Sequence, residues 1–173
     1  MTDIRIAPPD KITHIVEVFT HIHWPLPVES VDRVIHDLGW TRMPPPPRIH
    51  IIPDFEVSHP YATFLDGKGT TLEGNGILEI DCWVSDSPDE SNDLKPMRQA
   101  YKAVRAVVVS AVGQPMGGRG LDSWWDLPTG GRIHVKGDKT VVALQLLSKI
   151  FADTERDEVR FGISPDRVLG EDD

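Results

Sequence analysis

The sequence predicts an α+β fold in which helices pack on one face of an antiparallel sheet. Three observations lead to this expectation. Apolar residues recur at helical spacing in two early segments and in one central segment. Between and after them lie about six short segments rich in β-formers, bounded by Gly, Pro and Asp. The order helix, helix, three strands, helix, three strands and a last short helix is typical of helices covering a sheet of two strand groups.

Two helices are predicted at the start of the chain. Residues 11–22 carry an apolar stripe after Asp10, which is suited to an N-cap. Residues 29–38 form a second stripe, and Gly39 follows where a left-handed C-cap is favourable. Prolines 44–47 then predict a stiff polyproline II connector, because each ring fixes φ and removes a backbone donor.

The first three strands are predicted at residues 48–52, 61–65 and 77–85. The third has the clearest alternation and should be half-buried. Its two predicted faces are Leu78, Ile80, Cys82 and Val84, against Ile77, Glu79, Asp81 and Trp83.

The central helix is predicted at residues 94–112, with Asp93 as its cap and Gly113 at its end. Its expected inward residues are Leu94, Met97, Ala100 or Tyr101, Val104, Val108 and Ala111. Three strands at 122–127, 132–136 and 140–147 should form a meander. A short helix or irregular segment follows from Ser148, and residues 170–173 should be frayed.

Composition narrows the class of protein. The chain has 173 residues, which fit one α+β domain over 1–173. Its net charge of −9 argues against phosphate backbones and anionic membranes, so we expect neither a nucleic-acid nor a membrane partner. No signal-peptide pattern is present, and the single cysteine, Cys82, cannot form an internal disulfide. We therefore expect a cytoplasmic protein.

No motif for catalysis, metal binding or a cofactor emerges from the sequence. The Gly-rich segment 113–120 has Arg119 and Gly120 where a phosphate loop needs Lys and Ser or Thr, and it follows a helix instead of opening one. His14 and His21 stand seven residues apart on a helix, about 10 Å along its axis, which is too far to share an ion. Cys82 lies on an apolar strand face and resembles a buried hydrophobe. We expect no cofactor, no metal and no catalytic residue, although a dispersed triad would escape such an argument.

Carboxylates and tryptophans on the predicted strands are the strongest remaining signal. If the apolar side of each strand packs inward, these residues share the outer side of the sheet. The candidate partner-binding residues are Glu79, Asp81, Trp83, Asp122, Trp124, Asp126 and His134. Trp is enriched at interface hot spots, and charge complementarity speeds association. An ordinary solvated face and a paired-carboxylate hydrolase remain alternative interpretations.

Two segments carry a resemblance to a known family. Residues 19–40 read FTHIHWPLPVESVDRVIHDLGW, and residues 112–147 contain the elements GQP, WWDLP and RIHV. Together they resemble a family of small actinobacterial cytoplasmic proteins of uncharacterised function. That resemblance implies a helical start ending in Leu-Gly-Trp and a tryptophan-led terminal meander. The size and architecture also resemble bacterial toxin immunity proteins and small secretion chaperones as classes.

The resulting functional hypothesis is a non-enzymatic protein-binding module. Its most concrete form is an immunity protein that neutralises a cognate bacterial toxin, such as a basic toxin domain, through an acidic, Trp-containing surface. The alternatives are a secretion chaperone-like protein, and a small hydrolase or ligand-binding enzyme that uses the strand carboxylates. The sequence makes no prediction of the oligomeric state.

Overall fold

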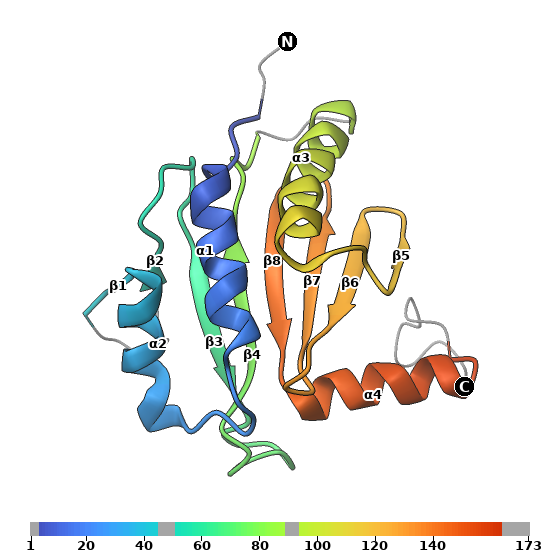
Figure 1. Cartoon of the computed structure of the whole chain (residues 1–173). Helices are drawn as coiled ribbons and strands as arrows, with labels where there is room; N and C mark the ends of the chain where they lie inside the picture. Colours follow the sequence, from blue (N-terminus) through green and yellow to red (C-terminus); the bar gives the residue numbers. More distant parts are fainter. Residues whose placement is uncertain (1–3, 45–50, 89–93, 164–173) are drawn as a thin grey trace.

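Eight strands form one antiparallel sheet in the computed structural model, which describes residues 4–44, 51–88 and 94–163. The strand order is β1-β2-β3-β4-β8-β7-β6-β5 (Figure 1). The strands are Thr41–Arg42, Ile51–Ile52, Ala62–Asp66, Ile77–Trp83, Gly117–Arg119, Asp122–Asp126, Arg132–Gly137 and Val142–Leu147, as β1 to β8. Each half of the sheet is a meander, and the antiparallel β4–β8 pair joins the two halves.

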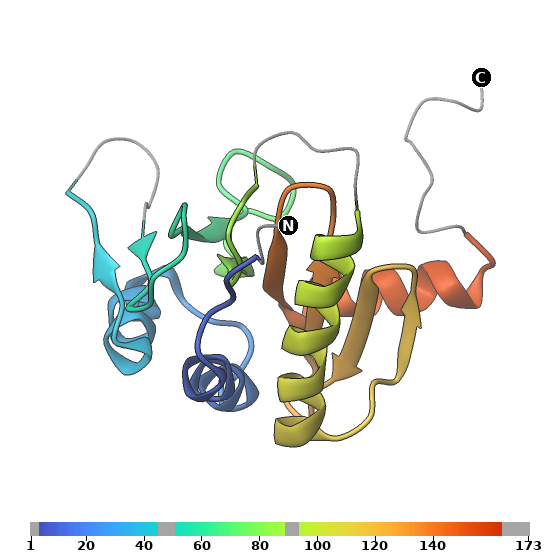
Figure 2. The ribbon, with the colours of Figure 1, turned by 90° about the horizontal axis from the view of Figure 1, so that it is seen from above.

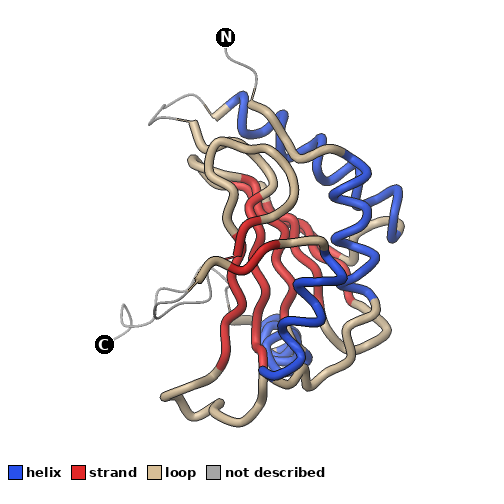
Figure 3. Tube along the Cα trace, turned by 90° about the vertical axis from the view of Figure 1, so that its left-hand side faces the viewer, coloured by secondary structure: helices blue, strands red, loops and turns tan. Residues whose placement is uncertain are grey.

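Three helices lie on one side of the sheet. They are α1 (Pro9–Thr20), α2 (Val31–Leu38, after the 3₁₀ turn Val28–Ser30) and α3 (Lys95–Val112). Seen from above, they share the same side of the row of strands (Figure 2), and the side view agrees (Figure 3). Gly39 ends α2 with φ of 70°, the left-handed conformation that glycine adopts without steric cost.

The main core lies between these helices and the sheet. The helices contribute apolar stripes, and the strands contribute every second residue. Its largest fully buried side chains are Ile12, Ile15, Phe19, Leu38, Ile51, Ile77, Ile80, Met97, Ile133, Leu144 and Leu146. Cys82 is fully buried in this core, and burial raises the pKa of its thiol well above the ordinary value.

A fourth helix, α4 (Lys149–Arg160), departs from the expectation that helices pack on one face alone. It begins at Ser148, whose hydroxyl accepts a hydrogen bond from the backbone N–H of Phe151. Its side chains bond to Arg132 and His134, which alternate with the core residues Ile133 and Val135. Therefore α4 lies on the opposite side of the sheet from α1 and α3.

The predicted α+β class with an antiparallel sheet is confirmed, with local differences. The short strands β1 and β5 were not predicted, because two or three residues give no readable alternation. Ala111, expected inward on α3, is exposed. The connector at prolines 45–47, the Asp93 cap and the frayed end at 170–173 lie outside the described residues.

The predicted faces of β4 differ at the start of that strand. The register with β3 shifts at Leu65/Asp66, so that Asp66 pairs with Ile77 and Leu65 pairs with Glu79. This bulge places Ile77 in the main core, whereas Leu78 is buried outside it. From Glu79 onward the predicted alternation holds.

None of the helices in the described ranges is both long and apolar enough to cross a bilayer.

Candidate functional site

All seven candidate residues lie on the side of the sheet away from α1 and α3, which we call the outer face. Strand β4 contributes Glu79, Asp81 and Trp83, and their neighbours Ile80 and Cys82 point into the core. Strands β6 and β7 contribute the other four, Asp122, Trp124, Asp126 and His134, on either side of inward residues such as Trp125 and Ile133. The β4–β8–β7–β6 order places one strand, β8, between β4 and β7.

The strand register arranges the outer face in three rows that run across the sheet. We name each row by its residue on β8. They are the Leu147 row (Glu79, Leu147, Arg132, Asp126), the Gln145 row (Asp81, Gln145, His134, Trp124) and the Ala143 row (Trp83, Ala143, Lys136, Asp122).

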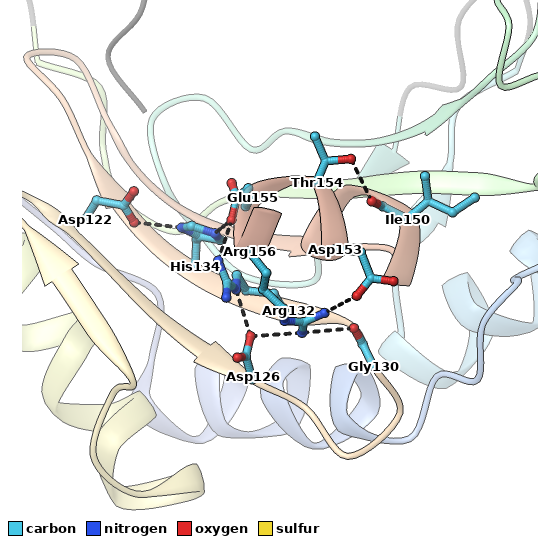
Figure 4. Close-up of polar contacts among 10 residues, drawn as sticks. All are labelled: Asp122, Asp126, Gly130, Arg132, His134, Ile150, Asp153, Thr154, Glu155 and Arg156. Carbon is cyan, nitrogen blue, oxygen red and sulfur yellow. Dashed lines mark hydrogen bonds and ion pairs between the residues drawn. The ribbon is translucent and has the colours of Figure 1, made fainter. Parts of the chain in front are cut away.

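An ionic cluster, the α4 cluster, joins α4 to the first two rows (Figure 4). His134 uses both ring nitrogens: Nδ1 lies 2.8 Å from Asp122 Oδ1, and Nε2 lies 2.9 Å from Glu155 Oε2. Arg132 donates to Asp126 Oδ1 at 2.8 Å and to Glu155 Oε2 at 3.0 Å. His134 is only 3% exposed. In this arrangement, neither ring nitrogen of His134 is left for a substrate.

A second arginine in the α4 cluster ties the helix to the edge of the sheet. Arg156 donates to Asp126 Oδ1 at 3.0 Å, to Asp153 Oδ1 at 2.7 Å and to the Gly130 carbonyl at 3.1 Å. The apolar part of the α4 contact is small, since Ala152 is the residue of α4 that is fully buried. Ion pairs therefore hold much of this helix in place.

The pKa shifts in the α4 cluster favour the charged forms of His134, Glu155 and Asp126. Burial opposes the charged form of His134, but the hydrogen bonds to Asp122 and Glu155 outweigh it and raise the pKa of His134. Burial raises the pKa of Glu155, but the bonds from His134 and Arg132 outweigh that effect and lower the pKa overall. The pKa of Asp126 is lowered in the same way, by Arg132 and Arg156 against burial.

Trp124 is enclosed by its own chain. A Cβ atom at Gly117 would lie 2.3 Å from Trp124 Cζ2, so the indole packs directly on the backbone of β5. The guanidinium of Arg132 lies 5.8 Å from the Trp124 ring centroid, within the range of a cation–π contact. Trp124 thus contributes to the internal structure of this region.

A hollow of about 450 Å³ opens over the third row, and we call it the Ala143 hollow. Ala143 stands between the longer side chains of Trp83 and Lys136, so its small methyl group leaves a depression in the sheet surface. The Trp83 ring lies 4.9 Å from that of Tyr61, centroid to centroid. The charged and aromatic residues that line the hollow are Asp81, Trp83, Asp122, Lys136, Asp138 and Arg119.

Asp81 is a partly buried carboxylate in the lining of this hollow. Burial, and then the neighbouring Glu79, raise its pKa to about 6, although Lys136 and a hydrogen bond with Trp83 act in the opposite direction. Glu79 accepts a hydrogen bond from Gln145 at 2.7 Å. A half-buried acid with a shifted pKa in a hollow is a candidate functional group on physical grounds.

Two histidines of α1 and its C-terminal end bond to backbone carbonyls. A hollow of about 590 Å³ between α1 and α2 is lined by His14, His21 and His23, among others. The His14 ring bonds to the Asp37 carbonyl, and the His21 ring bonds to the Glu17 carbonyl. Within the described ranges, no three His, Cys, Asp or Glu side chains come together as a metal site would require.

The strand alternation predicts that all seven candidate residues share the outer face, but it does not predict the partners that α4 supplies. Glu155 and Arg156 lie on α4, and ion pairs between a helix and a distant strand leave no periodic signal. The alternation in β7 does predict Lys136 on the outer face beside His134, whereas Ala143 of β8 has no feature that singles it out in the sequence.

The fold and the site define an α+β protein with one helix-covered sheet face and one polar, partly open face. The chain belongs to DUF6301, a family of unknown function whose model matches residues 10–148. This match spans the elements from α1 to β8, while Glu155 and Arg156 of α4 lie beyond it. No curated protein and no solved structure matches the chain.

Proposed function

We propose that this chain is a protein-binding module that docks its partner on the outer face of the sheet, over the Ala143 hollow. The observation that carries the proposal is the placement of Trp83 and Asp81 beside that hollow, on a sheet face that α4 covers elsewhere. A partly exposed Trp next to a depression is the arrangement found at interface hot spots, where one aromatic anchor supplies much of the binding energy.

The charge of the chain supports a basic partner. With 27 acidic and 18 basic residues, the chain attracts cationic surfaces at long range and accelerates encounter with them. The finer form of the proposal is an immunity protein of an actinobacterium that neutralises a basic toxin domain in the cytoplasm. A buried, reduced Cys82 is compatible with that compartment.

A second candidate function, acid–base catalysis in a small hydrolase, is favoured by one observation. Asp81 has a pKa raised to about 6, which would let it hold or release a proton near neutral pH. His134 does not support this alternative, because both of its nitrogens bind carboxylates. Hydrolysis of ester or glycoside substrates that is lost in Asp81→Asn would favour the enzyme.

Affinity capture from a lysate of the native host, followed by mass spectrometry, tests the binding proposal. Wild type is compared with Glu79→Lys/Asp81→Lys, which reverses charge on the outer face, and with Trp83→Ala. The matched control is Glu17→Lys/Asp37→Lys, which makes the same charge change at exposed positions of α1 and the α2 end. Thermal melts establish that each variant is folded.

The proposal predicts one stoichiometric partner that wild type and the control retain and that both outer-face variants lose. For the immunity form, the captured protein should be a toxin whose activity the purified chain inhibits. Equal recovery of the partner by the outer-face variants would show that docking occurs elsewhere. Recovery of the bait alone would turn attention to the enzyme assays.

A further inference from the structure

The outer face carries the same pair of residue types twice. Strand β4 has Asp81 and Trp83 two positions apart, and strand β6 has Trp124 and Asp126 two positions apart. In each strand the residue between them points into the core, so both pairs stand on the outer face.

The pair on β6 shows what this combination binds, because the chain fills it with its own arginine. The Arg132 guanidinium lies 5.8 Å from the Trp124 ring centroid and bonds to the Asp126 carboxylate at 2.8 Å. A planar guanidinium suits both contacts, since it stacks on aromatic rings and donates in a fixed fork to carboxylates.

The pair on β4 lies beside a hollow large enough for a second guanidinium. The Ala143 hollow measures about 450 Å³, within the range of small-molecule sites. Its lining includes three carboxylates, Asp81, Asp122 and Asp138, and two cations, Lys136 and Arg119. Two of the carboxylates are engaged within the chain, because Asp122 bonds to His134 and Asp138 accepts from the backbone of its own turn. Asp81 is therefore the carboxylate that an arriving cation would pair with.

We propose that the Ala143 hollow is an arginine-binding site, in which the guanidinium of a partner's arginine side chain contacts Trp83 and pairs with Asp81. This inference rests on the proposed function, because the arginine would come from the protein partner. Lys136 is the internal competitor, because its ammonium charge already acts on Asp81. Two opposite effects are therefore expected. Removing the Asp81 charge should weaken arginine binding, and removing the Lys136 charge should strengthen it.

The test is an NMR titration of the full chain with Nα-acetyl-arginine N-methylamide, which needs no partner protein. The readout is the indole N–H signal of Trp83, assigned with Trp83→Phe. The neutral citrulline analogue, the lysine analogue and acetate are titrated in parallel. Lys102→Met, at an exposed position on α3, is the control for Lys136→Met.

The arginine probe should shift the Trp83 indole N–H signal saturably. This shift should exceed those caused by the citrulline analogue, the lysine analogue and acetate. Asp81→Asn should weaken binding by up to about five-fold, and Lys136→Met should tighten it by a similar factor, as for single exposed ion pairs. Lys102→Met should have no effect. Bound arginine should also lower the pKa of Asp81 below its value of about 6 in the free chain.

Several outcomes would overturn the inference: no saturable shift, equal shifts with citrulline, lysine or acetate, or weaker binding in Lys136→Met. The opposite signs expected for the two variants separate a specific site from general loss of structure. Arginine binding without a captured partner would count against the proposed function alone. A captured partner without arginine binding would count against this inference alone.

Discussion

The imidazole Nε2 of His134 lies 2.9 Å from Glu155 Oε2, and this contact joins the central part of the sheet to the last described helix. His134 is on β7, whereas Glu155 is on α4, 21 residues further along the chain. The same carboxylate oxygen accepts from Arg132. Glu155 therefore links α4 to two buried cations of the sheet.

Glu155→Gln should destabilise the protein by about 1–3 kcal/mol, because a charge-assisted acceptor for Arg132 and His134 is lost in a buried setting. Urea denaturation at neutral pH measures this change. Asp157→Asn, at an exposed position of the same helix, is the matched control and should change stability by less than about 0.5 kcal/mol. Equal effects of the two variants would contradict the importance of the α4 cluster.

The protonated form of His134 should stabilise the fold, because its hydrogen bonds to Asp122 and Glu155 outweigh the effect of burial. Its pKa is raised in the folded state, so this stabilisation is complete below the unfolded value of about 6.5 and is lost as the pH rises through the folded value. Wild type should therefore lose stability relative to His134→Gln as the pH rises from about 6.5 through the folded pKa of His134. Denaturation series from acid to alkaline pH give the difference, with His59→Gln, at an exposed position, as control. An NMR titration midpoint of His134 below 6.5 would refute the assignment.

The carboxylates of the α4 cluster should determine how stability changes at acid pH. The pKa values of Asp126 and Glu155 are lowered in the folded state, so their stabilising effect is present above their unfolded values of about 4 and is lost as the pH falls through the lower folded values. As the pH falls from about 4 to 3, the free energy of unfolding of Asp126→Asn/Glu155→Gln should decrease less than that of wild type. An unchanged acid limb in that double variant would argue against these ion pairs.

Asp81 should have the opposite effect on stability. Its pKa is raised to about 6, so ionising it costs stability increasingly as the pH rises from the unfolded value of about 4 to the folded value. Asp81→Asn should therefore stabilise the protein by about 1–2 kcal/mol at pH 8, a figure reduced for partial solvent screening, and by less at pH 5. Denaturation at the two pH values measures this. A variant less stable than wild type at pH 8 would show that Asp81 is structural.

Gly117→Ala should destabilise the edge of the sheet by about 1–3 kcal/mol, because its methyl group would meet the Trp124 indole. A double-mutant cycle with Trp124→Leu isolates the clash, since removing the indole should abolish most of the cost of the alanine. Additive losses in the two variants would place the cost in the backbone of β5 instead.

The fold was predictable where apolar and polar residues alternate regularly along the sequence. The alternation in residues 79–84 correctly separated Asp81 and Trp83 from Ile80 and Cys82, because side chains of a strand alternate regardless of their partners. The bulge that redirects Leu78 depends on pairing with β3, so a local pattern could not reveal it.

The common location of the candidate residues on one face of the sheet was predictable, but their contacts were not. Sequence reasoning treated Asp122, Asp126 and His134 as open partner-binding groups, whereas the structure engages them with cations or carboxylates of the same chain. Such ion pairs depend on how α4 crosses the sheet. The depth of the hollow, likewise, depends on Ala143 having two longer neighbours on other strands.

Site-specific photo-crosslinking in the native host tests whether a partner docks on the outer face. Benzoylphenylalanine replaces Thr140, an exposed residue in the lining of the hollow, or Lys102 on α3, on the opposite side of the sheet. One discrete heteromeric crosslink is expected from position 140 and none from position 102. Crosslinking from position 102 alone, or the same products from both positions, would contradict docking on the outer face.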